Sequence, residues 1–206
     1  MRENNMMMYA GYEEVIAPNL YYDNSFDIEA AKLLPGEYYV TARDMVLVTV
    51  LGSCVAACIR DRFSGIGGMN HFTIPGKSSD LLSGSARYGA YAMEKMINEL
   101  LKMGAKRSNL EAKLFGGCNV LRGFTVTNMG ERNTEFAINY LRNEKIAIVA
   151  QDMLDIYPRK VYFFPASGKV RVRQLRNMHN DTIIEREQSY RSRIKVADVQ
   201  GDVELF

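Results

Sequence analysis

The sequence has no marked excess of charge and no long apolar run. Of its 206 residues, 26 are Lys or Arg and 24 are Asp or Glu, which gives a net charge of +2. This near balance argues against a protein that binds nucleic acid through bulk electrostatics. The most apolar stretch, residues 46–59, is interrupted by Thr49, Gly52 and Ser53. It is too short to span a bilayer, so we expect no membrane insertion.

Cysteine is scarce, and no secretion signal is visible. The cysteines are Cys54, Cys58 and Cys118, and an odd number would leave one unpaired in an oxidising compartment. Residues 1–20 lack a continuous apolar segment followed by a small-residue cleavage site. We therefore expect a soluble protein of the reducing cytoplasm.

The rest of the composition is that of a globular domain, with 47% hydrophobic and 24% charged residues. Residues 38–41 follow a Pro-Gly turn and are expected to form a strand. Residues 45–60 predict one strand, or two strands with a bend at Gly52-Ser53. A turn at residues 61–65 leads to an extended segment over 66–73, which makes a plausible antiparallel pair with the preceding strand.

Further along the chain, helices and strands alternate only in part. Residues 76–84 are predicted to form a loop, and a helix capped by Ser83 or Ser85 should end at Gly104. A second helix is expected to be capped by Asn133. The remaining predicted elements are strands at 112–115 and 146–150 and a hairpin of 161–164 with 170–175. This order favours an α+β fold, a layered sandwich of mostly antiparallel or mixed sheets with flanking helices.

Both ends of the chain differ from this core. Residues 1–32 show little periodicity and are expected to be an irregular N-terminal extension. Residues 176–206 are dominated by charged and amide side chains through residue 196. This C-terminal segment is expected to be a solvated tail or a peripheral helix, or else a docking segment for a partner. The folded domain is then expected over residues 33–175.

One cysteine and one of the two histidines stand in a pattern that suggests chemistry. His71 follows Cys54 by 17 residues, so a hairpin can bring the thiol and the imidazole together. A thiol nucleophile needs such a base, because a free cysteine is mostly protonated at neutral pH. Gly52 and Ser53 would let the backbone turn and direct amide N–H groups at an oxyanion.

Two other interpretations of these residues stay open. Cysteine is often simply buried in an apolar strand, and we expect Cys58 and Cys118 to be core residues. A zinc site made of the three cysteines and His71 is disfavoured. On an extended strand Cys54 and Cys58 would lie roughly 13 Å apart, too far to share one tetrahedral ion. We expect no metal site and no cofactor.

The segments around these residues resemble the CheD family of chemoreceptor glutamine deamidases. The signature is VTVLGSCVAACIRDRFSGIGGMNHFTIP, residues 48–75, and the similarity extends over about residues 33–175. The resemblance implies a protein-glutamine glutaminase that converts glutamines of methyl-accepting chemotaxis receptors to glutamate in signal transduction. It implies Cys54 as nucleophile, His71 as general base and acid, and Thr49 as the third member of the triad.

The resemblance implies further assignments. The reaction would pass through a thioester on Cys54 and release ammonia. Gly67, Gly68 and Asn70 would line the groove that receives the substrate. On an ideal strand Thr49 and Cys54 face opposite sides, so the bend at Gly52-Ser53 must reset the alternation. The partners would be chemotaxis receptors and a CheC-type phosphatase.

Two alternatives to glutamine deamidation remain at this level. One is a non-catalytic adaptor that binds receptors or a CheC-type phosphatase, although a pure binder has no reason to keep both Cys54 and His71. The other is receptor methylesterase or amidase activity, which uses the same thioester chemistry.

Overall fold

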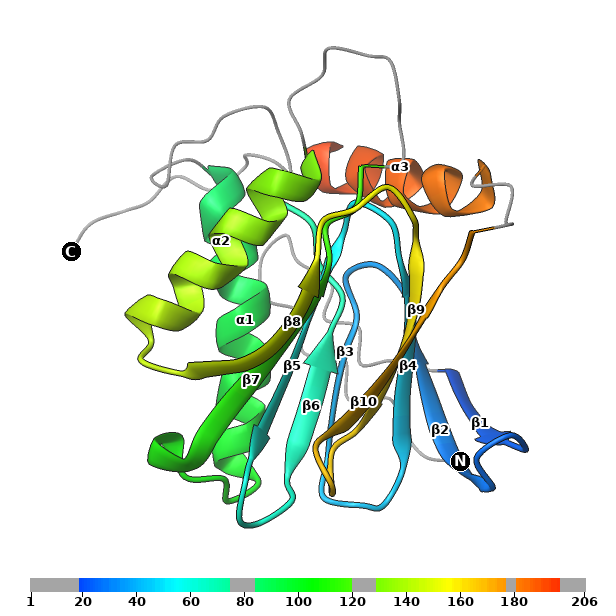
Figure 1. The fold of residues 1–206 in the computed structure, drawn as a ribbon. Helices are drawn as coiled ribbons and strands as arrows, with labels where there is room; N and C mark the ends of the chain where they lie inside the picture. Colours follow the sequence, from blue (N-terminus) through cyan, green and yellow to red (C-terminus); the bar gives the residue numbers. More distant parts are fainter. Residues whose placement is uncertain (1–18, 75–83, 120–128, 177–180, 197–206) are drawn as a thin grey trace, which may run out of the picture.

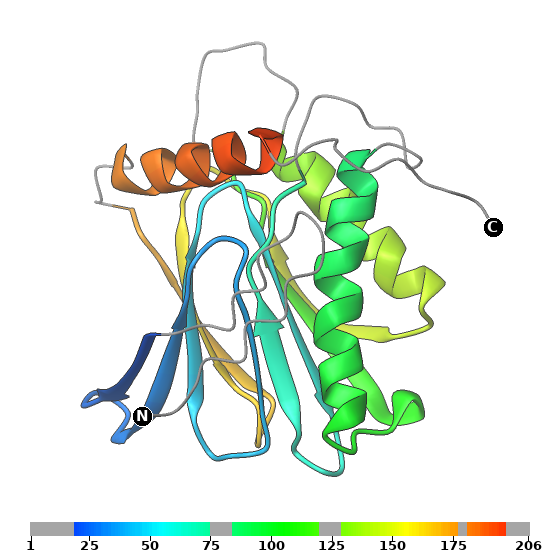
Figure 2. The ribbon, with the colours of Figure 1, turned by 180° about the vertical axis from the view of Figure 1, so that it is seen from behind.

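The computed structural model describes residues 19–74, 84–119, 129–176 and 181–196. Over these residues, two five-stranded sheets pack face to face, and two helices cover the outer face of one sheet (Figures 1 and 2). A third helix, α3 (Asp181–Val196), lies across one end of the layers (Figure 1). This arrangement confirms the predicted α+β class.

The first sheet has the strand order β1-β2-β4-β9-β10. Strands β2 and β4 run parallel, and the other neighbours are antiparallel. The β9–β10 pair is the hairpin predicted from the sequence. The strands are β1 (Asn19–Asp23), β2 (Ile28–Leu33), β4 (Val46–Leu51), β9 (Arg159–Phe164) and β10 (Lys169–Gln174).

The second sheet has the order β3-β6-β5-β7-β8. The predicted antiparallel pairing of β5 with β6 is confirmed, and β7 and β8 run parallel. The short 3-10 helix Arg107–Asn109 precedes β7. The strands are β3 (Tyr38–Thr41), β5 (Val55–Asp61), β6 (Gly67–Asn70), β7 (Leu110–Gly116) and β8 (Ala147–Met153).

Two apolar layers hold the sandwich together. The layer between the sheets includes Leu47, Met69 and Phe163, each at most 1% exposed. The layer between the second sheet and the helices includes Ile59 and Met96. Because β5 contributes alternate side chains to both layers, all but one of its residues are buried. The strand that follows the candidate site is therefore firmly anchored.

Helices α1 (Gly84–Lys102) and α2 (Met129–Asn143) cover the second sheet. The start of α1 agrees with the prediction, and Gly104, with φ of +103°, lies just beyond its end. Ser83 and nearly all of the predicted loop over 76–84 lie outside the described residues. The predicted cap at Asn133 is wrong, because α2 begins four residues earlier and buries Asn133 within the helix.

The predicted irregular segment before residue 33 is in part regular. Residues 19–33 form the β1–β2 hairpin, and β2 pairs with β4. Its sequence, IEAAKL, has weak intrinsic strand propensity, so pairing and burial of Ala30, Ala31 and Leu33 supply the stabilisation. The first 18 residues lie outside the described part of the chain.

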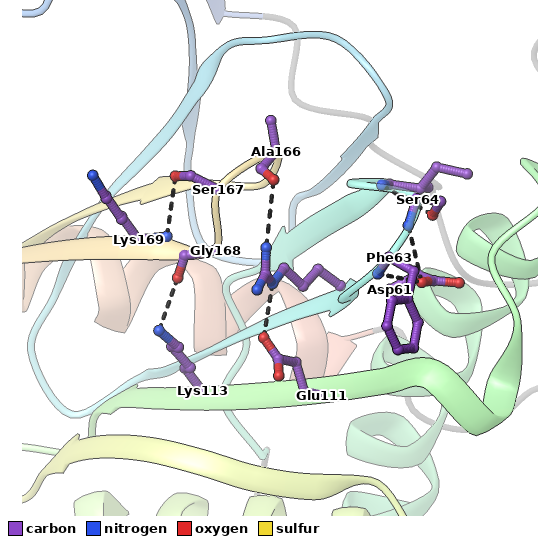
Figure 3. Close-up of polar contacts among 11 residues, drawn as sticks. Asp61, Phe63, Ser64, Glu111, Lys113, Ala166, Ser167, Gly168 and Lys169 are labelled. Atoms are coloured by element: carbon purple, nitrogen blue, oxygen red, sulfur yellow. Dashed lines mark hydrogen bonds and ion pairs between the residues drawn. The ribbon is translucent and has the colours of Figure 1, made fainter.

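Polar contacts tie the two sheets together at the end away from α3 (Figure 3). Lys113 of β7 donates a hydrogen bond of 2.8 Å to the carbonyl of Gly168 in the β9–β10 turn. Arg60 of β5 pairs with Glu111 at 2.7 Å and donates to the carbonyl of Ala166. These contacts fix how the sheets stack, and so where β4 and β5 meet at the opposite end.

No helix within the described residues is long and apolar enough to cross a membrane.

Candidate active site

The site is built on the short connection between the two sheets. Strand β4 of the first sheet ends at Leu51, and β5 of the second begins at Val55. The carbonyls of Gly52 and Cys54 accept hydrogen bonds of 2.9 and 2.8 Å from the N–H groups of Cys118 and Gly117. The predicted bend at Gly52-Ser53 is confirmed, and the chain after β7 holds its shape.

A glycine is required where β7 approaches this connection. Gly116 has φ of +110°, and a Cβ there would lie 2.3 Å from the carbonyl oxygen of Cys54. A side chain would therefore clash with the backbone as well as strain it. The end of β7 therefore packs directly against the backbone of Cys54. This contact helps to fix the position of Cys54.

His71 follows β6 and is held through its backbone. Its N–H donates to the carbonyl of Glu37 at 2.9 Å, and its carbonyl accepts from the N–H of Gly36 at 2.7 Å. Both partners belong to the turn before β3. His71 is 2% exposed and Cys54 is 0% exposed. The imidazole and the thiol thus meet inside the protein, where water does not compete for their contacts.

Thr49 determines the proton position on His71. The Thr49 hydroxyl donates to the carbonyl of Leu33 at 2.9 Å and lies 2.8 Å from Nδ1 of His71. Because its only proton is used on Leu33, the hydroxyl must accept a hydrogen bond from a protonated Nδ1. His71 then carries its proton on Nδ1, and Nε2 has a free lone pair. Within the described residues, Nε2 has no hydrogen-bond partner.

Burial makes this imidazole neutral at physiological pH. Removal from water lowers the pKa of His71 to about 4, and the nearby negative charge of Glu187 offsets part of that effect. A neutral imidazole with a free Nε2 can accept a proton from a thiol. The arrangement is therefore that of a neutral imidazole held in one tautomer beside a thiol.

The bend at Gly52-Ser53 changes the side of the chain to which the following side chains point. Thr49 on β4 and Cys54 after the bend both face His71, although they would face opposite sides on one continuous strand. The structure thus brings together the three residues predicted as a triad.

Asn133 braces the connection from α2. Its side-chain amide donates to the carbonyl of Ser53 at 2.8 Å and to the hydroxyl of Thr73 at 3.0 Å. Its Oδ1 accepts from the N–H of Ile74 at 2.8 Å. The fully buried side chain links the residue before Cys54 to the segment that follows His71. This role of Asn133 was not predicted from the sequence, which suggested a helix cap instead.

A carboxylate from the C-terminal helix occupies the amides of the connection. Glu187 belongs to α3 (Asp181–Val196), and its Oε1 accepts hydrogen bonds from the N–H groups of Gly52 at 2.9 Å and Cys54 at 3.2 Å. Its Oε2 accepts from the Ser53 N–H at 3.1 Å and the Ser53 hydroxyl at 2.6 Å. Converging N–H donors of this kind stabilise a negative oxygen.

Glu187 is a residue of the site that was not predicted from the sequence. It is one of many acidic side chains in a charged segment with weak apolar periodicity, so no local pattern distinguishes it. The only available signal was the alternative interpretation of residues 176–206 as a docking segment. The described helix of that segment, Asp181–Val196, contacts the site of its own chain through Glu187.

The side chains of Cys54, His71 and Glu187 are of types that can bind a metal ion. One ligand atom each from Cys54, His71 and Glu187 lies within 4.8 Å of the others. Both oxygens of Glu187, however, already accept two hydrogen bonds, which uses their lone pairs. The donors around the carboxylate are those of an anion site rather than of a metal centre.

The residues predicted to line a substrate groove lie in packing positions. A Cβ on Gly67 would lie 2.9 Å from side chains of Arg60 and Pro165, and one on Gly68 would lie 2.8 Å from a backbone oxygen. The Asn70 side chain accepts from the N–H of Ala57 at 3.0 Å and donates toward α1. These contacts hold β6 against its neighbours.

The other two cysteines are buried thiols. Cys58 lies in the layer between the sheets, and burial raises the pKa of its thiol. Burial also raises the pKa of Cys118 to about 12. Both therefore stay protonated and unreactive at neutral pH.

The sequence of the chain is similar to those of one family of known proteins. The profile of the family described as CheD chemotactic sensory transduction matches residues 74–174. The probable chemoreceptor glutamine deamidase CheD of Thiobacillus denitrificans is 61% identical over 202 residues, which cover 97% of this chain and 100% of that protein. Its counterpart in Methylobacillus flagellatus is 62% identical over 198 residues, which cover 94% and 98%.

Among solved structures, Bacillus licheniformis hypothetical protein YfiH aligns with a TM-score of 0.39 at 14% identity, over 58% of this chain and 51% of that one. A likeness this weak supports no argument.

Proposed function

The chain belongs to the CheD family, and from that premise we propose that it is a protein-glutamine glutaminase acting on chemoreceptors. Its relatives of about three-fifths identity are named probable chemoreceptor glutamine deamidases. The observation that best supports the proposal is the position of Cys54. The thiol lies beside a neutral imidazole held by Thr49, next to backbone N–H groups that already bind a carboxylate.

In the proposed first step, Nε2 of His71 takes the Sγ proton of Cys54. The sulfur then bonds to the side-chain carbonyl carbon of a receptor glutamine. The N–H groups of Gly52, Ser53 and Cys54 receive the negative oxygen that develops on that carbon. As the C–N bond breaks, His71 returns the proton to the departing nitrogen, and ammonia leaves.

In the second step, His71 removes a proton from a water molecule that attacks the thioester. The C–S bond breaks, the Cys54 sulfur takes the proton from His71, and the receptor then carries glutamate. Throughout, Thr49 keeps Nδ1 protonated and so keeps Nε2 facing the reacting atoms. Each turnover adds one negative charge to the receptor surface.

We also propose a cellular compartment, a partner and the extent of the domain. We assign the enzyme to the cytoplasm, where the signalling parts of receptors and a reduced Cys54 would both be found. A CheC-type phosphatase remains a proposed partner. We propose that the deamidase domain includes the β1–β2 hairpin as well as residues 33–175, because β2 is a member of the first sheet.

Ammonia release from a purified receptor signalling fragment tests the proposal. Wild-type protein should release ammonia, Cys54→Ala should release none, and His71→Ala should be nearly as impaired. Cys58→Ser is the matched control, because Cys58 is a buried thiol outside the site. Ammonia release by Cys54→Ala equal to that of wild type would rule out the proposed nucleophile.

A further inference from the structure

We propose that α3 is a built-in product analogue that closes the active site, so that a receptor glutamine must displace Glu187 before it can react. The inference rests on the proposed function for its meaning in catalysis. Its structural part, closure of the site by α3, stands on the contacts of Glu187 and can be tested without any substrate.

The first observation is the fit of the Glu187 carboxylate. It takes four hydrogen bonds of 2.6 to 3.2 Å from the three residues Gly52, Ser53 and Cys54. These donors are the ones that would hold the oxygen of a substrate amide. A glutamate side chain is also what glutamine deamidation produces. Glu187 therefore occupies the position of the product carboxylate.

The second observation is that the site is inaccessible with α3 in place. Cys54 is 0% exposed and His71 is 2% exposed, and Glu187 itself is 5% exposed. A small pocket beside His71 is closed on one side by Arg186 and Glu187 of the same helix. Figures 1 and 2 show α3 lying across the end of the sheets where β4 turns into β5. In this state the thiol and the imidazole are both buried.

The third observation concerns the side chains of α3 that the structure describes. Among its described side chains, Glu187 and Tyr190 are buried, one helical turn apart, while neighbours such as Glu185 and Gln188 are exposed. The Tyr190 ring covers Gly36, where a Cβ would lie 2.3 Å from the Tyr190 hydroxyl. That hydroxyl also contacts the hydroxyl of Tyr88.

This attachment differs from that of the other helices. Helices α1 and α2 bury apolar stripes against the second sheet, whereas the described part of α3 adds no member to an apolar layer. Polar contacts at one spot can be exchanged for those of another helix that presents a glutamine. The described contacts of α3 can thus be released while the sheets stay folded.

The same geometry predicts that Glu187→Gln converts α3 into a substrate. The Cys54 sulfur would bond to the carbonyl carbon of the new side-chain amide, the C–N bond would break, and ammonia would leave with the proton from His71. Water would then cleave the thioester and regenerate Glu187 and the thiol. One water is consumed and one ammonia is released, so the product is the wild-type chain.

The test uses two measurements on the full chain. The first is the rate at which iodoacetamide alkylates Cys54, mapped by peptide mass spectrometry, in wild type, Glu187→Ala and Glu185→Ala. If α3 is a closure held by Glu187, alkylation in Glu187→Ala should be faster by about tenfold or more, since population of the open state sets the rate. Glu185→Ala, an exposed change on the same helix, should match wild type. Equal rates in all three proteins would overturn the closure.

The second measurement is the mass of the peptide that contains residue 187 in the Glu187→Gln variant. The proposal predicts that the introduced amide at position 187 is converted to a carboxylate and that Gln188 stays glutamine. The double variant with Cys54→Ala should keep the introduced amide.

The two measurements separate the inference from the proposed function. An unconverted amide at position 187 in a protein that deamidates the receptor fragment would overturn the product-analogue placement and leave the proposed function standing. Faster alkylation of Cys54, without deamidation at position 187 or of the receptor, would instead contradict the proposed function and leave the closure standing.

Discussion

At the scale of single residues, the site depends on which nitrogen of His71 carries the proton. Thr49 sets this by donating to Leu33 and accepting from Nδ1. The sequence could bring Cys54 and His71 together, because a cysteine and a histidine on paired strands limit each other's positions, whereas Thr49 was implied by the resemblance to the CheD family. It could not place Glu187, whose partners lie more than 130 residues away along the chain.

The role of Thr49 predicts a separation between two similar variants. Thr49→Val keeps the shape but loses the hydroxyl, so the imidazole is no longer held in one tautomer. We expect the rate of receptor deamidation to fall roughly tenfold to a hundredfold, the equivalent of one oriented hydrogen bond of ~1–3 kcal/mol. Thr49→Ser should retain most of the activity in the ammonia assay. Equal activity of the Val and Ser variants would show that the hydroxyl does not position His71.

The buried state of His71 predicts a pH dependence of stability. Its pKa is lowered to about 4, so between that pH and the ordinary value of 6.5 the unfolded chain binds a proton that the folded chain does not. Stability from this group is fully present above about 6.5 and is lost as pH falls toward 4, by up to roughly 3 kcal/mol.

Urea unfolding of wild type and His71→Gln at several pH values measures this difference. The wild-type free energy of unfolding should decline relative to that of the variant as the pH falls from neutral to about 4. Parallel declines in both proteins would contradict the assigned state of His71.

At the scale of elements, the site exists because β4 and β5 belong to different sheets. The chain must turn between them, and the turn points the N–H groups of Gly52, Ser53 and Cys54 in one direction. The turn was predictable from Gly52-Ser53. The bracing by α2 was not, because Asn133 next to Thr134 looks like a helix cap, and its real partners come from another part of the chain.

The contacts of Asn133 predict that its replacement destabilises the fold. Asn133→Ala leaves the Ile74 N–H and the Ser53 carbonyl without their partner inside the core. We expect a loss of about 2–4 kcal/mol in the free energy of unfolding, measured by urea denaturation. Glu135→Ala, an exposed change two residues along the same helix, is the control and should change stability by less than about 0.5 kcal/mol. A similar small change in Asn133→Ala would mean that the brace contributes little.

At the scale of the whole molecule, the contacts that join the two sheets and the candidate active site lie at opposite ends of the sandwich. One end is tied by Lys113, Arg60 and the β9–β10 turn, and the other carries the Cys54 connection under α3 (Figures 1 and 3). The class of fold was predictable from hairpins at both ends of the core. The β1–β2 hairpin was not, because alanine and lysine in β2 give no strand signal until β4 lies beside them.

Cys54 is proposed to convert receptor glutamines to glutamate. The most direct measurement is peptide mass spectrometry of a receptor signalling fragment after incubation with wild type, Cys54→Ala or Cys58→Ser. We predict the mass gain of an amide-to-acid conversion at defined glutamines with wild type and Cys58→Ser, and an unchanged fragment with Cys54→Ala. The same conversion in the presence of Cys54→Ala would contradict the claim.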